Sequence, residues 1–347
     1  MTRSRDVSRY SDQALQKLSD DLMAGKRRAL SKALTLIESH APSHRPAALK
    51  LISVLEKGQR APALRLGISG APGAGKSTLI EALGLFLLEQ GHRVAVLAVD
   101  PSSRQSGGSL LGDKTRMEQL SCSDQAFVRP APSGFSPDGV SLGGVAFRTR
   151  ESILLCEAAG YDIVIVETVG VGQSEAAVAD LTDLFLFVLS PGAGDDLQNM
   201  KKGVMEIPDC FVVNKADGAL LPFARRAASD CRAALQLSGH RPSENAPSGR
   251  RSVLLCSALE KSGLDLLWQE LQSLKQERLD LGAFEERRLQ QRQRWFEEEL
   301  RHQTMEKLFT KLDAAEPAVE KIRKAVLEGQ LGPGQGAQEL LELLWKE

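Results

Sequence analysis

At residues 70–78 the chain carries the stretch Gly70-Ala71-Pro72-Gly73-Ala74-Gly75-Lys76-Ser77-Thr78, which fits the pattern Gly-x-x-x-x-Gly-Lys-Ser/Thr without a gap. The short run Leu64–Ser69 before it suits a strand, and apolar residues recur at helical spacing from Leu79 to Leu87 after it. Strand, glycine-rich loop and helix therefore follow one another in the order that a phosphate-binding loop requires. An accidental glycine-rich turn is the alternative, and this frame argues against it.

Each residue type in the loop has a chemical reason to be there. The glycines let backbone N–H groups curl around phosphate oxygens, and the helix that follows presents its positive N-terminus to them. Lys76 can reach the β- and γ-phosphates, and the Ser77 hydroxyl can ligate Mg²⁺. We therefore expect Lys76 to be catalytic and the whole loop to hold a nucleotide.

Composition excludes several classes of function. The 347 residues are 42% hydrophobic and 26% charged, with a formal net charge of -1, which gives no electrostatic case for binding nucleic acid or a membrane. No apolar run approaches the ~20 residues that span a bilayer. The five cysteines form no Cys-x-x-Cys pair, so we interpret them as reduced thiols of a cytoplasmic protein. Arg3, Arg5 and Arg9 are the one hint of an organellar presequence, and Asp6 and Asp12 argue against it.

The pattern predicts an α/β fold, a P-loop NTPase with a mainly parallel central sheet flanked by helices. Apolar runs alternate with helical patterns, at Val94–Val99, Ala126–Val128, Ile163–Val166, Leu184–Leu189, Phe211–Val213 and Val253–Cys256. Apolar stripes on charge-rich helices lie before and after this part. We expect an N-terminal helical extension over residues 1–63, a P-loop nucleotide-binding domain over 64–283 and a C-terminal helical dimerisation arm over 284–347.

Three polar segments follow predicted strands, at Asp100–Asp113, Glu167–Glu175 and Pro191–Lys202. Since strand ends of a parallel sheet meet at one edge, Asp100, Asp113 and Glu167 are candidate Mg²⁺ ligands together with Ser77. Asp100 and Glu167 are also candidate catalytic acids, and Gln173 could orient the attacking water. In the alternative, Asp100 only caps a turn and residues 191–202 are a surface loop; the functional interpretation makes them a switch that contacts a partner.

The residues that follow two further predicted strands indicate which base the nucleotide carries. Asp217, in Asn214-Lys215-Ala216-Asp217, can accept hydrogen bonds from both N1–H and the 2-amino group of guanine, and adenine offers no such pair of donors. Lys215 can lie along the base, and Asn214 can tie this segment to the phosphate loop. Ser257-Ala258-Leu259 follows the last strand and can give a backbone N–H to the guanine oxygen. The ligand is therefore expected to be GTP or GDP rather than ATP.

These motifs together resemble the MeaB/ArgK/MMAA GTPases, from about residue 28 to the end of the chain. The resemblance rests on Val99–Ser103, Gly112–Met117, Glu167–Glu175 and Gly194–Gly203. It implies a homodimeric GTPase chaperone that gates cofactor loading and protects or reactivates an adenosylcobalamin-dependent acyl-CoA mutase such as methylmalonyl-CoA mutase. In a eukaryote the expected location becomes the mitochondrial matrix. One departure is the segment 133–144, which is longer than the family's usual turn.

Other functions remain open at this stage. A metal-delivery GTPase would need a His-rich tract or paired cysteines, and the five histidines are scattered. A nucleotide-dependent protein kinase would need an acceptor pocket with a base aimed at it, and no motif supplies one. A nucleotide sensor without useful turnover is the remaining alternative, because only Gln173 is available as the residue that positions water.

Overall fold

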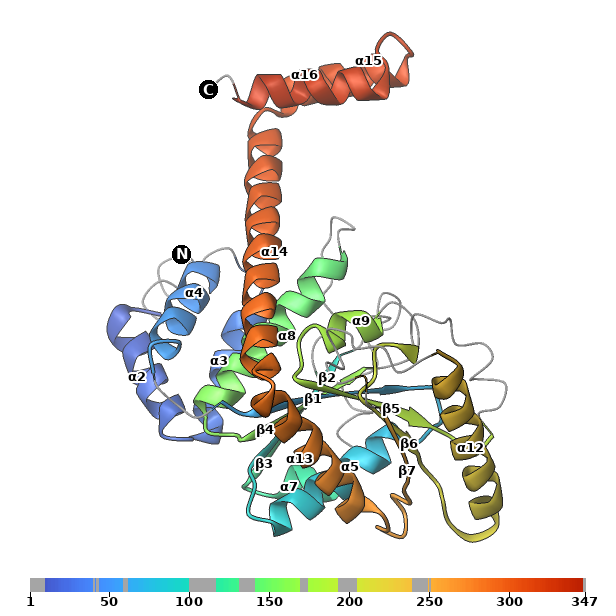
Figure 1. Cartoon of the computed structure of the whole chain (residues 1–347). Coiled ribbons are helices and arrows are strands. Elements are labelled where there is room, and N and C mark those ends of the chain that lie inside the picture. Colours follow the sequence, from blue (N-terminus) through green and yellow to red (C-terminus); the bar gives the residue numbers. More distant parts are fainter. Residues whose placement is uncertain are drawn as a thin grey trace. The chain divides into compact units, whose positions relative to one another are not determined.

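The computed structural model (Figure 1) divides into two compact units, Met1–Gln291 and Arg292–Glu347. The residues that it describes are 10–39, 41, 44–58, 62–99, 117–130, 141–168, 174–192, 205–238, 249 and 251–345.

A seven-stranded sheet forms the centre of the first unit, with strand order β3-β2-β4-β1-β5-β6-β7. Every pairing between neighbouring strands is parallel. The strands are β1 (Leu64–Gly70), β2 (Val94–Val99), β3 (Ala126–Pro130), β4 (Ile163–Thr168), β5 (Leu184–Leu189), β6 (Cys210–Val213) and β7 (Ser252–Leu255). This confirms the predicted α/β fold with a parallel sheet, and it places β1 in the middle, between β4 and β5.

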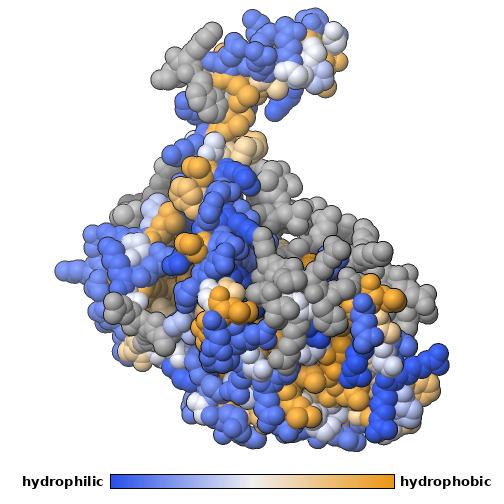
Figure 2. Space-filling model, viewed as in Figure 1, coloured by the Kyte–Doolittle hydropathy of each residue, from blue (hydrophilic) through white to orange (hydrophobic). Residues whose placement is uncertain are grey.

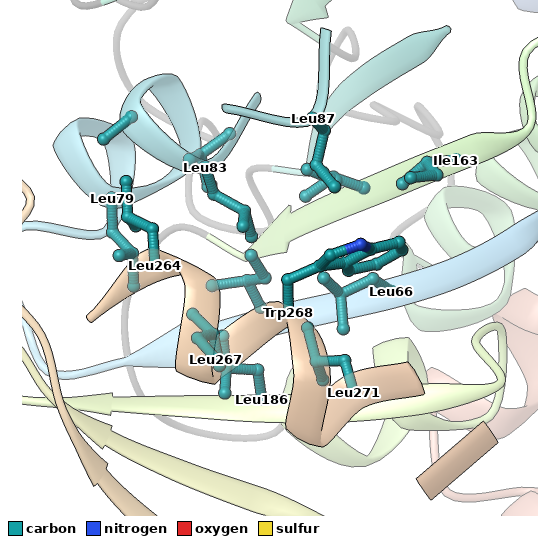
Figure 3. Close-up of a cluster of buried hydrophobic side chains, with 14 of the residues drawn as sticks. Leu66, Leu79, Leu83, Leu87, Ile163, Leu186, Leu264, Leu267, Trp268 and Leu271 are labelled. Carbon is teal, nitrogen blue, oxygen red and sulfur yellow. The ribbon is translucent and has the colours of Figure 1, made fainter. Parts of the chain in front are cut away.

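Helices cover both faces of the sheet, which explains why its strands are continuously apolar. On one face lie α5 (Lys76–Glu89), α7 (Glu118–Cys122) and α13 (Leu264–Asp280). Figure 3 shows Trp268 of α13 among leucines of α5 and the strand residues Leu66, Ile163 and Leu186. The other face carries α8 (Ser141–Ala158), α9 (Ser174–Ala179) and, after the short 3₁₀ turn Gly218–Leu220, α12 (Leu221–Ser238).

The N-terminal helices pack on the same unit. They are α2 (Asp12–Met23), α3 (Arg27–Glu38) and α4 (His44–Leu55), and α3 and α4 contact α8. Their buried stripes of leucine and alanine supply most of this packing. Two ion pairs add to it: Arg45 donates to the buried Glu151 of α8 at 2.8 Å, and Arg129 of β3 binds Glu38.

Three helices make up the end of the chain: α14 (Ala283–Ala314), α15 (Glu316–Leu327) and α16 (Pro333–Trp345). In the second unit α15 packs on α16. The contact needs a glycine at position 336, because a Cβ there would lie 2.5 Å from a methyl carbon of Val326. Among the described residues, no helix is long and apolar enough to cross a membrane.

Candidate functional site

The phosphate loop connects the central strand β1 to α5, at the carboxyl edge of the sheet. Two of its glycines are required by close approaches. A Cβ on Gly70, whose φ is +149°, would lie 2.2 Å from the Val188 carbonyl oxygen of β5, and a Cβ on Gly75, at φ +85°, would lie 2.6 Å from Nδ2 of Asn214. Pro72 and Gly73 are exposed, whereas Ala74 is buried under the loop. The loop is therefore packed from below by β5 and Asn214 and is open above.

Lys76 is the first residue of α5, and its side chain folds back over the loop. Its Nζ donates to the carbonyl oxygens of Gly70 at 2.7 Å and Ala71 at 3.1 Å. These bonds hold the ammonium beside the loop's backbone N–H groups. Positive charge and N–H dipoles are thus gathered in one place, which is the requirement for binding phosphate.

Ser77 and Glu167 come together from different elements. The Ser77 hydroxyl on α5 donates to Oε1 of Glu167 at 2.9 Å, and Glu167, near the end of β4, is 5% exposed. One residue further, the buried Thr168 hydroxyl donates to the Ser69 hydroxyl of β1 at 2.7 Å. The first bond joins α5 to the end of β4, and the second joins the ends of β4 and β1. The sequence signals for Ser77 and Glu167 were the phosphate-loop motif and the polar residue at the end of a predicted strand.

The donor set at Ser77 and Glu167 fits Mg²⁺, which prefers carboxylate and hydroxyl oxygens and retains several waters. Within the described residues no cluster of three or more His, Cys, Asp or Glu side chains is present. Asp100 and Asp113, the other two expected metal ligands, lie outside the described residues, as do Gln173 and the segment 193–202. The longer segment 133–144 is described only from Ser141, where α8 begins.

Asn214 connects the phosphate loop to the base segments. Its Nδ2 donates to the carbonyl oxygens of Ala74 at 3.1 Å and Gly75 at 3.2 Å, and its Oδ1 accepts from the Ala258 N–H at 3.1 Å. The residue is 1% exposed, so these bonds form away from water. One side chain thus fixes three segments that are far apart in the sequence.

Asp217 is held by a residue of the other base segment. The Ser257 hydroxyl donates to Oδ2 of Asp217, and the Glu260 N–H donates to that hydroxyl at 3.0 Å. Lys215 takes a left-handed φ of 59°, and its Nζ donates to the Gly73 carbonyl oxygen at 2.7 Å. A non-glycine residue in this conformation is uncommon and marks functional sites more often than ordinary loops. The sequence placed Lys215 beside the base and gave no sign of its bond to the phosphate loop.

The remaining expected site residues lie where the loops turn. Thr78 is exposed in the first turn of α5. The Leu259 side chain is 80% exposed next to Ala258. Base segments and phosphate loop therefore form one continuous surface at the carboxyl edge, as ligand sites of open α/β sheets do.

Comparison with known proteins gives consistent matches along nearly the whole chain. The family model described as "Methylmalonyl Co-A mutase-associated GTPase MeaB" matches residues 30–316. A putative GTPase of Caulobacter vibrioides is 48% identical over 94% of this chain and 97% of its own length. The GTPase ArgK of Escherichia coli is 43% identical, covering 93% and 94%. The mitochondrial methylmalonic aciduria type A homolog of Mus musculus is 41% identical, covering 94% and 79%.

One solved structure is similar to this chain over nearly its whole length. The crystal structure of a LAO/AO transport system kinase superposes with a TM-score of 0.70 and 35% identity, over 96% of this chain and 98% of that one.

Proposed function

Since the chain belongs to the MeaB family of methylmalonyl-CoA mutase-associated GTPases, we propose that it is a chaperone that gates cofactor loading and protects or reactivates an adenosylcobalamin-dependent acyl-CoA mutase. The protein is a P-loop GTPase, a hydrolase that cleaves the phosphoanhydride of GTP. The observation that carries the chaperone role is the match over residues 30–316 to a family described by its association with that mutase. The 41% identity to a relative named for methylmalonic aciduria supports it.

We assign the nucleotide contacts from the geometry. The guanine base contacts Asp217, with Lys215 along its face and the Ser257–Leu259 segment at its oxygen. The phosphates lie in the loop 70–78, with Lys76 moving from the Gly70 and Ala71 carbonyl oxygens to phosphate oxygens. Asn214, which already bonds to both regions, keeps their spacing fixed.

GTP hydrolysis then depends on positioning of the reacting groups and on electrostatic stabilisation, because phosphoryl transfer requires little covalent chemistry from the protein. Lys76 stabilises the charge that develops on the transferred phosphoryl group. We propose that Ser77 and Glu167, with Asp100 and Asp113, hold Mg²⁺ directly or through its waters, and that Gln173 orients the attacking water. When bound, the metal ion supplies positive charge next to the phosphate oxygens.

The coupling to the mutase is assigned to residues 192–202, which follow β5 in the sequence. Asp195, Gln198 and Lys201 lie outside the phosphate loop and the base segments in the sequence. Their replacement by Ala should leave intrinsic GTP hydrolysis within about threefold of normal, while it reduces the stimulation by a cognate mutase, because lost contacts weaken the coupling between sites.

GTP turnover is measured for each variant with and without purified mutase, and Lys57→Ala, an exposed lysine that precedes β1, is the matched control. Unchanged stimulation in all three variants would remove the role of this segment. The chaperone role itself would be contradicted if no adenosylcobalamin mutase changed GTP turnover. It would also be contradicted if the GTPase had no effect on cofactor loading.

A homodimer is also proposed, from the apolar stripe on α14. Leu289, Phe296 and Leu300 are 60%, 68% and 56% exposed, and their spacing of seven and four residues puts them on one face of the helix. Figure 2 shows hydrophobic side chains along α14. Light scattering of Phe296→Glu and Leu300→Glu tests this: the native chain should have the mass of two copies and the variants that of one. We propose a cytoplasmic location, or the mitochondrial matrix in a eukaryote, in line with the mitochondrial relative.

A further inference from the structure

The first turns of α14 are bonded to the end of α9. Arg287 donates from one amino group to the Ala179 carbonyl oxygen at 2.6 Å and from Nε to the Thr182 carbonyl oxygen at 3.0 Å. Gln291, one turn later, donates from Nε2 to the same Thr182 oxygen at 3.0 Å. Both side chains are buried, 8% and 3% exposed. The end of α9 is therefore capped by side chains from a segment more than a hundred residues later in the sequence.

Such capping matters because the last carbonyl groups of a helix have no partner within the helix. In α9 the Val178 oxygen accepts from the Leu181 N–H and the Thr182 hydroxyl, and the Ala179 oxygen accepts a long 3.3 Å bond from the Thr182 N–H. Arg287 adds the strongest contact to this end, and a cation is favoured there. Burial lowers the pKa of Arg287, with Arg278 also lowering it and Asp209, Asp183 and Asp180 opposing.

At its other end, α9 follows residues 169–173 in the sequence, which lie outside the described residues. Ser174, its first residue, follows Gln173, and the segment before it starts at Glu167. Along its length α9 packs on β1 at Gly67, three residues before the phosphate loop. A Cβ at Gly67 would lie 2.8 Å from the Thr182 hydroxyl oxygen and 3.1 Å from a Val178 methyl carbon. The helix is thus confined between β1 and the base of α14, with little room to shift while Arg287 holds it.

We propose that Arg287 is a positioning residue for GTP hydrolysis, which fixes the end of α9 against β1 and, through that helix, supports the assigned function of residues 167–173, which precede it in the sequence. It follows that a displacement of the base of α14 changes turnover through this contact. The inference rests on the proposed role of residues 167–173. It adds a residue from the C-terminal helices to the machinery that sets the hydrolysis rate.

The neighbouring residue provides a matched control. Arg288 binds both carboxylate oxygens of Asp183, at 2.9 and 2.7 Å, and the Ala63 carbonyl oxygen at 2.6 Å. It anchors the same turn of α14 to the beginnings of β1 and β5 and has no hydrogen bond to α9 among those that the structure describes. Loss of Arg288 therefore weakens the attachment of α14 without releasing α9.

The experiment compares Arg287→Gln, Gln291→Leu and Arg288→Gln in the full-length protein, without mutase. Steady-state kinetics give kcat and KM for GTP, fluorescent GDP gives affinity, and hydrogen exchange reports on the peptide spanning residues 174–183. Arg287→Gln should lower kcat by at least about fivefold, since small misplacements far from the chemistry are costly. Nucleotide affinity should stay within about twofold, and exchange in 174–183 should rise. Gln291→Leu should show the same pattern more weakly, because it removes one uncharged bond.

Arg288→Gln should lower the melting temperature while kcat and exchange in 174–183 stay near those of the native protein. Equal effects of Arg287→Gln and Arg288→Gln on kcat would overturn the proposal, as would a parallel loss of nucleotide affinity in Arg287→Gln. If Arg287→Gln does not fold, Gln291→Leu decides alone. Gln173→Ala distinguishes failure of the proposed role of residues 167–173 from failure of the inference about Arg287. If Gln173→Ala leaves turnover normal, that proposed role fails and the inference fails with it. If it lowers turnover while the α14 variants do not, only the inference fails.

Discussion

The Ser77 hydroxyl donates a 2.9 Å hydrogen bond to the Glu167 carboxylate, which joins the first turn of α5 to the end of β4. These two oxygens are also the proposed Mg²⁺ ligands that the structure describes. The bond therefore holds the metal-binding groups close together before any nucleotide arrives.

Glu167→Gln should raise the Mg²⁺ concentration needed for half-maximal GTP hydrolysis. An amide can still accept the bond from Ser77, but it has lost the negative charge that favours a divalent cation. A charge-assisted contact is worth roughly 1.5–3 kcal/mol, so we expect a shift of about tenfold or more. Turnover is measured against Mg²⁺ concentration, with the exposed Glu89→Gln as control. Superimposable curves for the two variants would show that Glu167 does not serve the metal.

Lys76→Ala should abolish hydrolysis. Its ammonium already lies at the loop, bonded to the Gly70 and Ala71 carbonyl oxygens. The charge that develops on the phosphoryl group would lose its main protein cation. Single-turnover assays with saturating GTP measure the chemical step apart from binding. Near-normal rates in this variant would mean that the loop is not the catalytic phosphate site.

Asp217→Asn should weaken GTP binding by about 1–3 kcal/mol, the cost of leaving a buried donor without a partner. It should also relax selection against xanthine nucleotides, because the amide offers a donor where the carboxylate offered only acceptors. Ser257→Ala removes the hydroxyl that holds Asp217, so it should also weaken GTP binding, by a smaller amount. Calorimetric titration with GTP, ATP and XTP measures this. Equal affinity of the native protein for ATP and GTP would contradict the assignment.

The sequence was sufficient for the parts of the molecule that depend on periodicity and local motifs. Strands at Val94–Val99 and Leu184–Leu189 begin and end as predicted. A strand of a parallel sheet is buried on both faces, so a continuous run of apolar residues marks its full length. The phosphate loop likewise lies between β1 and α5, since its glycines are needed for close backbone approach.

Contacts between segments distant in the sequence could not be predicted in this way. The apolar stripes of the C-terminal helices drew attention to leucine, tryptophan and phenylalanine. Yet Arg287 and Gln291 bond the first turns of α14 to the end of α9, and Arg288 bonds them to the beginnings of β1 and β5. Arginine and glutamine usually lie on the surface, and only the three-dimensional arrangement shows which of them are buried. For the same reason, the bond from Lys215 to Gly73 had no signal in the sequence.

Asp209→Ala should destabilise the fold by about 3–5 kcal/mol, because it removes the buried carboxylate of an ion pair and leaves its cationic partner buried. Asp209 is 2% exposed, accepts the Phe185 N–H at 2.7 Å, and forms an ion pair with Arg278, which is 4% exposed. The double variant Asp209→Ala/Arg278→Met should regain part of the loss, since the remaining charge is removed as well. Urea unfolding at pH 7 gives the free energies. A double variant less stable than Asp209→Ala would show that Arg278 has other partners that matter more.

The cysteines should differ sharply in reactivity. Cys122 is exposed, whereas the other four are buried. Burial raises the pKa of Cys231 and of Cys256 to about 12, and raises that of Cys156 further. The thiolate is the reactive form, so raising the pH from 7 to 9 leaves the thiols of Cys156, Cys231 and Cys256 protonated and unreactive in the folded protein, and Cys210 is protected by burial. A maleimide should therefore label one cysteine rapidly at pH 8 and all five in urea, and Cys122→Ser should abolish the rapid phase. Rapid labelling of two or more sites in the native protein would contradict this prediction. It would mean that the helices covering the sheet open and expose a buried thiol. Hydrogen exchange in α8, α12 and β7 would then have to be correspondingly fast.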